Sequence, residues 1–198
     1  MMELTVYYIN AKENDFSSLP EEFFSHDEKA KIERCKNPSV KQERIASAYL
    51  KKTLIGDYEV DEKGKPNAKG VHFNVSHSKG HVVLVKAPCP VGIDIEEVRE
   101  VKQDLIDFVC SPEEKAYIEN EERFFEVWTN KEAILKAKGI GLRNDLKGVP
   151  SLPLDAKKEY ESKIYLTKTI HYRGSVITLA LESEEAPEVA LTIKEIHL

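Results

Sequence analysis

One residue pattern occurs twice in this sequence, and it restricts the fold more than any other feature. Gly80 and Gly174 each open an apolar stretch that ends in a proline turn, and apolar residues then alternate over 91–95 and 189–193. Helical patterns precede the strands in both halves. The repeat predicts an α+β fold of two similar lobes, by duplication, although two ordinary hairpins in one small protein would show the same likeness.

Local signals place the individual elements. Capping boxes, an N-terminal proline and closing glycines predict helices over residues 25–35, 37–56, about 121–138 and one that begins at 111. Apolar periodicity predicts strands over residues 4–9, 71–76, 82–86, 91–96, 164–170, 175–181 and 189–196. The polar, glycine-bearing stretch over 57–70 predicts a loop.

Composition excludes several classes of protein. The chain has 198 residues, a net charge of −6 and three cysteines without a CxxC pair, which is typical of a reducing cytosol rather than of a disulfide framework or zinc ribbon. The longest apolar run is 82–85, far below the roughly 20 residues of a membrane helix. The start of the chain has no leader pattern, so we expect a cytoplasmic protein that binds neither membrane nor nucleic acid.

Charge is unevenly distributed along the chain. Residues 27–52 contain eight Lys or Arg against four Asp or Glu, whereas residues 94–126 contain twelve acids against four bases. A basic patch in an acidic chain favours a small polyanionic ligand at one place. Two solvated helical faces of opposite sign explain the same counts, and composition does not separate these interpretations.

The strand over 91–96 carries the sharpest chemical signal. Side chains alternate along a strand, so Gly92, Asp94 and Glu96 share the face opposite the apolar residues, with the two carboxylates roughly 6.5–7 Å apart at Cα. That spacing allows both to converge on one hard cation, and Gly92 leaves space beside them. An ordinary strand with a solvated polar face is the alternative, but the matching strand of the second half has no such acidic pair.

Two further segments are weak signals on their own. In the sequence WTNKEAILK, Glu132 and Lys136 lie one helical turn apart, which is also the spacing of a plain surface ion pair. In NVSHS, residues 74–78, a strand runs into a polar turn whose Ser76, His77 and backbone amides could face a phosphate. Zinc binding by His77 and His81 is disfavoured, because Gly80 and the turn composition argue against a helix there.

In combination, these motifs resemble a known family. Gly64-Lys65-Pro66, NVSHS, GIDIE and WTNKEAILK occur in the order and form found in Sfp-type 4′-phosphopantetheinyl transferases of the W/KEA kind. The resemblance spans roughly residues 25–142, and the gap from Glu96 to Trp128 is somewhat short for the family. It implies a pseudo-twofold pair of α+β lobes, residues 1–97 and 98–198, with the active site at their junction.

The resemblance also implies a reaction. The family transfers the phosphopantetheine arm of coenzyme A to a serine of an apo acyl or peptidyl carrier protein, releasing adenosine 3′,5′-bisphosphate, and we expect a monomer. Asp94, Glu96 and Glu132 would hold Mg²⁺, Glu132 would also accept the serine proton, and Lys136 would hold pyrophosphate oxygens. The residues expected around coenzyme A are Lys29, Arg44, Lys65, Pro66, Ser76, His77 and Lys136.

Some choices stay open from sequence. Lys31 or Arg34 could replace Lys29, because the register of the first helix is uncertain by a residue. A coenzyme A or carrier-binding module without turnover is the alternative function, against which the complete set of carboxylates argues. A metal-dependent nuclease is disfavoured, since the strand lacks the following (D/E)-x-K lysine and the chain is acidic. The carrier's pathway, whether fatty acid, polyketide or peptide synthesis, is not given by the sequence.

Overall fold

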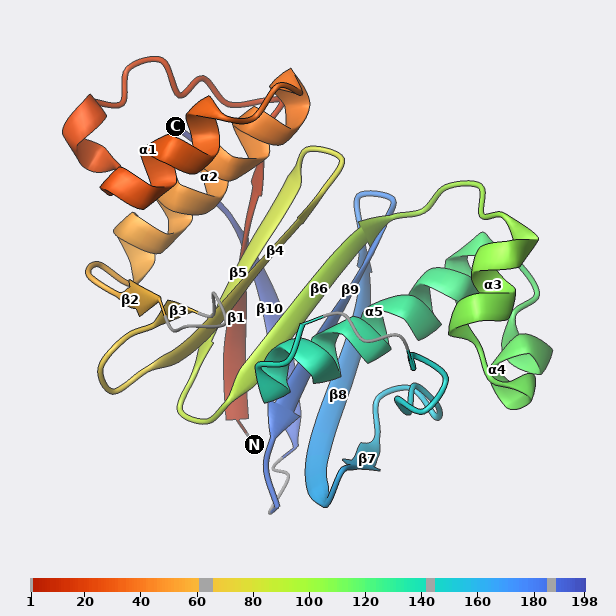
Figure 1. The fold of residues 1–198 in the computed structure, drawn as a ribbon. Helices are drawn as coiled ribbons and strands as arrows, with labels where there is room; N and C mark the ends of the chain where they lie inside the picture. Colours follow the sequence, from red (N-terminus) through yellow and green to blue (C-terminus); the bar gives the residue numbers. More distant parts are fainter. Residues whose placement is uncertain (1, 61–65, 142–144, 185–187) are drawn as a thin grey trace.

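The computed structural model of the chain describes residues 2–60, 66–141, 145–184 and 188–198. It has an α+β fold with two four-stranded sheets and helices packed against both (Figure 1). In chain order the elements are β1 (Met2–Asn10), the 3-10 turn η1 (Glu21–Phe23), α1 (His26–Glu33), α2 (Pro38–Leu54), β2 (Glu59–Val60), β3 (Pro66–Asn67), β4 (His72–Ser78), β5 (His81–Ala87), β6 (Val91–Glu97), α3 (Gln103–Val109), α4 (Pro112–Tyr117), α5 (Glu121–Lys138), β7 (Lys157–Tyr160), β8 (Lys163–Tyr172), β9 (Ser175–Glu182) and β10 (Val189–Glu195).

The predicted helix ends are confirmed by their capping contacts. Ser25 forms a capping box with Glu28 at the start of α1, and the Asn37 side chain caps α2. Gly139 closes α5 in the left-handed conformation, with φ 75°. The sequence did not predict α3, which has no side-chain cap at Lys102, nor the short strands β2, β3 and β7.

Each half of the chain contributes one strand to the other half's sheet. One sheet has the order β10-β1-β5-β4 and the other the order β6-β9-β8-β7. Strand β10 pairs in parallel with β1, and β6 pairs antiparallel with β9, with Asp94 opposite Thr178. In each half a long helix is followed by a strand hairpin and a last strand (α2, β4, β5, β6 and α5, β8, β9, β10), and each last strand pairs in the sheet of the other half.

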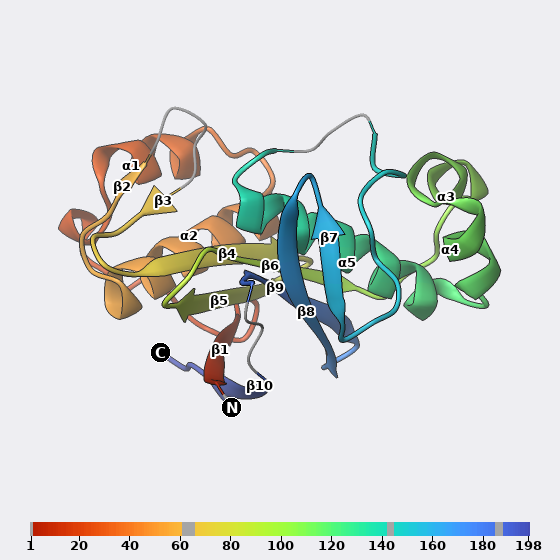
Figure 2. The same cartoon turned by 90° about the horizontal axis from the view of Figure 1, so that it is seen from below.

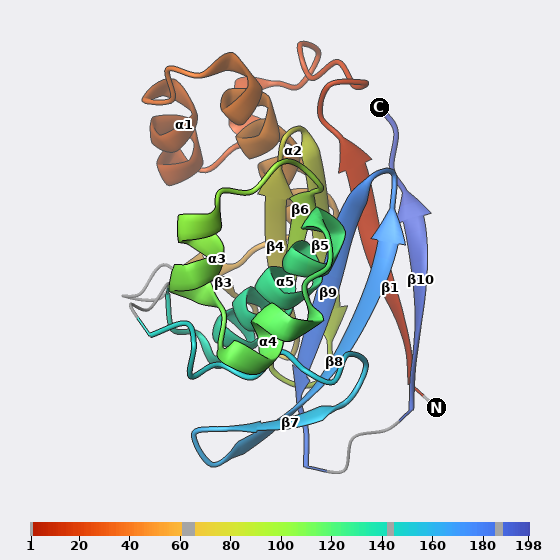
Figure 3. The same cartoon turned by 90° about the vertical axis from the view of Figure 1, so that its right-hand side faces the viewer.

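Three hydrophobic cores hold these layers together. The faces of the two sheets pack on each other through β1, β5, β6 and β9, with Val83, Ile93 and Ile177 among the buried residues. Helix α2 covers the outer face of the first sheet, and α5 covers β6 and β9 together with α3 and α4. Seen from below and from the side, the helices lie on one side of the central strands and β1 and β10 on the other (Figures 2 and 3). No helix in the described ranges is long and apolar enough to cross a bilayer.

The two sheets meet where β4 and β6 lie side by side (Figure 1), and we call this line of contact between the two strands the seam. Both are edge strands, so their facing backbone groups need partners from elsewhere. The Asn74 side chain accepts the amide hydrogen of Ile93 at 2.9 Å, and the Ser76 hydroxyl accepts that of Ile95 at 3.4 Å. The polar residues of β4 thus fix β6 in register with the first sheet.

Helix α5 crosses β6 in close contact at Gly92. A Cβ atom placed on Gly92 would lie 2.0 Å from the Ala133 carbonyl oxygen and 2.4 Å from the Ala137 nitrogen. Two small helix residues at i and i+4 therefore lie against a residue without a side chain. This contact sets the height of the helix above Asp94.

The loop side of α5 is anchored by a buried lysine. Lys131 is fully buried, and its Nζ donates to the carbonyl oxygens of Leu146 and Val149 at 2.8 and 2.7 Å. The same atom lies 2.7 Å from the carboxylate of Glu114 on α4. This lysine of the WTNKEAILK segment is thus committed to holding three parts of the chain together.

Replacing Gly92 by alanine is expected to destabilise the fold by about 3 kcal/mol or more, because the added methyl group meets helix backbone that has no rotamer to yield. Chemical denaturation of the variant measures this loss. Gly141→Ala is the matched control, since a Cβ at Gly141 meets no atom within 4 Å, and it should stay within about 0.5 kcal/mol of wild type. Similar stability for the two variants would contradict the close contact.

Lys131→Met is expected to cost about 3–5 kcal/mol, because it leaves the buried Glu114 carboxylate without its cation. Lys115→Met is the control: Lys115 pairs with Asp107 on the surface, where an ion pair contributes about 0–1 kcal/mol. Thermal unfolding of both variants distinguishes the two lysines. Equal melting temperatures would show that Lys131 is not an anchor.

Candidate functional site

Two acidic side chains of β6 lie under α5, at the seam between the sheets. Asp94 is buried and Glu96 is half-buried, both on the face that the sequence predicts. The alternative of a solvated strand face is therefore wrong for Asp94. The helix that crosses at Gly92 supplies the cover.

Hydroxyl groups from β4 hold both carboxylates. Ser76 Oγ donates to Asp94 Oδ1 at 2.9 Å, and Ser78 Oγ donates to Glu96 Oε2 at 2.7 Å. Arg99 Nη1 also donates to Glu96 Oε2 at 2.7 Å. Alternate residues of β4 thus orient alternate residues of β6.

Helix α5 adds a cation and a third carboxylate. Lys136 Nζ lies 2.6 Å from Asp94 Oδ1 and 2.8 Å from Ser76 Oγ, and it also donates to the Ile93 carbonyl at 3.2 Å. The interpretation of Lys136 as half of a plain surface ion pair with Glu132 is wrong, since its ion pair is with Asp94 across the seam.

Negative charge exceeds its compensation at this cluster. Asp94 Oδ2 and Glu132 Oε1 are buried and have no hydrogen-bond partner among the described residues. Burial, strengthened by the charge of Asp94 and only partly opposed by Lys136, raises the pKa of Glu132 to about 7. Burial also raises the pKa of Asp94, against the opposing effect of Lys136. Orphaned buried oxygens of this kind are suited to a hydrated divalent cation.

The carboxylates do not yet form a closed ligand cage. Across the described parts of the chain, no three His, Cys, Asp or Glu side chains are close enough together to hold one ion. Lys136 takes one oxygen of Asp94, and Ser78 with Arg99 takes one oxygen of Glu96. The cluster therefore has two buried oxygens without a hydrogen-bond partner, beside a lysine.

The residues expected around coenzyme A are more dispersed. Ser76 has its hydroxyl in the carboxylate cluster. His77, the next residue of β4, points to the opposite face of the strand and lies 2.8 Å from Glu43 on α2. Arg44 Nη1 donates to the Lys31 carbonyl at 2.5 Å, which ties α2 to α1. Lys29 is half-buried on α1.

Two expected residues cannot be placed. Lys65 lies outside the described residues, as does the side chain of Pro66. A cleft of about 680 Å³ lies between α1, the end of α2 and β4, and it is lined by Lys31, Lys51, Lys52 and Tyr58 among others. Lys31, one of the alternatives to Lys29 that the sequence leaves open, is among the residues that line this cleft.

Sequence reasoning missed Ser78, Arg99 and Glu43. Ser78 was visible as the third polar residue at alternate positions of NVSHS, but only the neighbouring strand gives it a role. Glu43 was counted as one acid in a basic helix, with no local signal that it is buried. His77 and His81 have different carboxylate partners, Glu43 and Glu97, so they do not form a pair.

Comparison with known proteins finds a family match over the part of the chain that contains β6 and α5. A family model described as the 4′-phosphopantetheinyl transferase superfamily matches residues 90–193, which is more than half of the 198 residues. The chain is 35% identical over 92 residues to 4′-phosphopantetheinyl transferase gsp of Aneurinibacillus migulanus, covering 43% of this chain and 39% of that protein.

Two other relatives match over longer segments. Identity to 4′-phosphopantetheinyl transferase Sfp of Bacillus subtilis is 27% over 158 residues, 69% of this chain and 67% of that protein. Identity to the L-aminoadipate-semialdehyde dehydrogenase-phosphopantetheinyl transferase of Schizosaccharomyces pombe is 32% over 154 residues, 60% of each chain. With the Aneurinibacillus protein, by contrast, the match spans about two fifths of the relative's length.

The matched region contains both the β6 carboxylates and the α5 segment with Glu132 and Lys136, which the fold brings together at one seam. The chain belongs to the 4′-phosphopantetheinyl transferase superfamily.

Proposed function

We propose that this protein transfers the 4′-phosphopantetheine arm of coenzyme A to a serine hydroxyl of an apo acyl or peptidyl carrier protein. The observation that carries the proposal is the cluster of Asp94, Glu132 and Lys136, with two orphaned carboxylate oxygens beside a lysine. Phosphoryl-group transfer needs positive charge on the phosphate oxygens and a base for the attacking hydroxyl. Family membership supports the same reaction.

Asp94, Glu96 and Glu132 are the residues that would hold Mg²⁺: Asp94 and Glu132 have open oxygens in the described structure, and Glu96, now held by Ser78 and Arg99, would have to move towards them. The open oxygens Asp94 Oδ2 and Glu132 Oε1 fit a hard cation, because few carboxylates with retained waters and substrate phosphates are what Mg²⁺ prefers. When bound, the ion would neutralise charge on the pyrophosphate.

The chain's own residues perform the rest. Glu132, whose pKa is raised to about 7 by burial, accepts the serine proton, directly or through water. The serine oxygen forms a bond to the phosphorus of the phosphopantetheine arm, and the bond from that phosphorus to the bridging oxygen breaks. The bridging oxygen leaves with adenosine 3′,5′-bisphosphate. Lys136, whose side chain is partly exposed and already contacts Asp94, holds pyrophosphate oxygens as charge develops on the leaving group.

Beyond the pyrophosphate contact of Lys136, coenzyme A binding is assigned to the other face of β4 and to the basic first helices. Lys29 or Lys31, Arg44, Lys65 and His77 would surround the 3′-phosphate and pyrophosphate. In this proposal the two lobes are related by a pseudo-twofold axis, and the active site lies at their junction. The protein acts in the cytoplasm and as a monomer.

The direct test is incubation with coenzyme A, Mg²⁺ and an apo carrier, followed by mass spectrometry of the carrier. The expected result is a mass increase of one phosphopantetheine arm, abolished by a chelator. Binding of coenzyme A without any mass increase would instead indicate a binding module that lacks turnover.

Glu132→Gln is expected to abolish transfer without loss of stability. The folded-state pKa of Glu132 is raised, so its stability contribution is complete below its unfolded pKa and is lost as pH rises through about 7. The variant should therefore melt at a higher temperature than wild type at pH 8, with the difference shrinking towards pH 5.

Lys136→Ala should lower kcat by about 10²-fold, more than it raises KM. Substantial transfer by Glu132→Gln would contradict this mechanism.

Recognition of the 3′-phosphate is tested with 3′-dephospho-coenzyme A. Charge-assisted hydrogen bonds to a phosphate contribute about 1.5–3 kcal/mol each, so coenzyme A should bind more tightly than the dephospho compound. Arg44→Ala should shrink the difference, as measured by calorimetry. Equal affinity of wild type for both compounds would place the basic patch outside the binding site.

A further inference from the structure

Glu43 is a buried acid that the transfer mechanism does not use. It is 4% exposed, on the face of α2 that packs on the first sheet. Its Oε1 accepts the amide hydrogen of Gly80 at 2.6 Å, and its Oε2 lies 2.8 Å from His77 Nδ1. Although burial opposes ionisation, His77, the Gly80 amide and Lys12 together hold the pKa of Glu43 below its usual value.

The other edge of the His77 ring is open. The side chain is 37% exposed, and within the described part of the chain its Nε2 has no hydrogen-bond partner. A buried carboxylate therefore holds one ring nitrogen while the second faces solvent. This is the arrangement in which a histidine is oriented by one anion and available to another.

The second half of the chain contains the same pair. Glu126 is also 4% exposed and is the sixth residue of α5, as Glu43 is of α2, and each helix begins at an asparagine cap. Its partner His171 is the next-to-last residue of β8, as His77 is of β4, and Glu126 Oε1 lies 2.9 Å from His171 Nε2. The two Glu–His pairs thus occupy equivalent positions in their halves.

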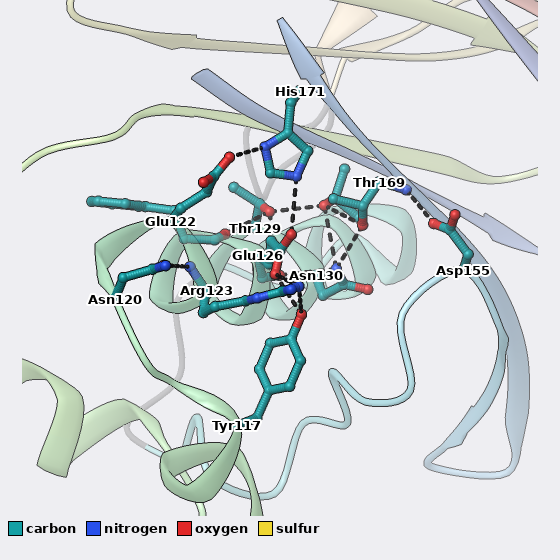
Figure 4. A network of polar contacts seen from close by, with 12 residues as sticks. Tyr117, Asn120, Glu122, Arg123, Glu126, Thr129, Asn130, Asp155, Thr169 and His171 are labelled. Atoms are coloured by element: carbon teal, nitrogen blue, oxygen red, sulfur yellow. Dashed lines mark hydrogen bonds and ion pairs between the residues drawn. The ribbon is translucent and has the colours of Figure 1, made fainter. Parts of the chain in front are cut away.

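The pairs differ at the second ring nitrogen. His171 Nδ1 lies 2.6 Å from Glu122, so this ring has an acid on each side, as Figure 4 shows. Glu122 is the second residue of α5, and the second residue of α2 is Ser39. Each nitrogen of the His171 ring therefore faces a carboxylate. In the first half, the position of the second anion is thus not taken by an acid of the helix.

We propose that Glu43 is a positioning residue that orients the His77 ring, so that His77 Nε2 faces and binds the 3′-phosphate of coenzyme A. The proposal rests on the proposed function and adds to it the residue that acts through His77. The external phosphate takes the place that Glu122 has beside His171. Glu43 itself does not contact the ligand.

The test measures binding of coenzyme A and of 3′-dephospho-coenzyme A by calorimetry, and compares the ratio of the two dissociation constants. Glu43→Gln keeps the hydrogen bond from Gly80 but removes the charge. It should weaken coenzyme A by about tenfold and leave the dephospho compound unchanged, as expected for losing one charge-assisted hydrogen bond. In a His77→Ala background, Glu43→Gln should change the ratio no further.

Glu126→Gln is the matched control, because it removes the same charge from an equally buried position without touching β4. Its ratio should equal that of wild type. If Glu43→Gln does not fold, Ser39→Glu replaces it. This change builds the Glu122 arrangement beside His77 and should weaken coenzyme A alone, whereas Ser39→Gln should not.

Two outcomes overturn the inference. The first is an unchanged ratio in Glu43→Gln or in Ser39→Glu. The second is equal weakening of both ligands, which would mean that Glu43 only joins α2 to the hairpin at Gly80. Failure of the proposed function has a different result: wild type would bind neither compound and would not modify a carrier. A wild type that transfers the arm and distinguishes the ligands, with an unaffected Glu43→Gln, refutes this inference alone.

Discussion

The close contact between α5 and β6 at Gly92 is the constraint on which the site depends. Because backbone atoms of the helix lie where a Cβ would be, α5 approaches the strand more closely than side-chain packing allows. At that distance Lys136 reaches Asp94, and the carboxylate of Glu132 affects the same cluster. A larger residue at 92 would raise the helix and separate the two sources of charge. The absence of a side chain at residue 92 therefore allows Lys136 and Glu132 to lie close to Asp94.

Two lysines of the same helix show how burial assigns different roles to one residue type. Lys131 is 0% exposed and its three contacts, two carbonyls and the Glu114 carboxylate, use the full donor capacity of an ammonium group. The Lys136 side chain is 27% exposed and is bonded to groups at the edge of the seam. An ammonium with access to solvent can exchange partners when an anionic ligand arrives, whereas a sealed one cannot without unfolding its surroundings.

Local periodicity predicted much of the site, and tertiary contacts supplied the remainder. The shared face of Asp94 and Glu96 follows from strand alternation, and the shared face of Glu132 and Lys136 follows from the helical turn. Gly92 was recognised as space for a neighbour, but the helix that fills it lies about forty residues along the chain. From sequence, the serines of β4 were interpreted as part of a phosphate-facing turn. Their actual partners are carboxylates of a strand in the other sheet, which local sequence does not indicate. The exchange of β6 and β10 between the sheets could not be predicted from the sequence, since an alternating apolar pattern is compatible with pairing in either sheet.

The exchanged strands have a consequence for synthesis on the ribosome. Among the described strands β1 is made before all the others and its parallel partner β10 after them, so the first sheet is complete only when translation has passed residue 195. Until then, one edge of β1 has no strand beside it, and apolar residues that β10 will cover are accessible. Pairings of such long sequence separation form slowly because loop-closure entropy must be overcome first. A nascent chain of this topology therefore has a prolonged interval in which a chaperone, or another copy, could bind that edge.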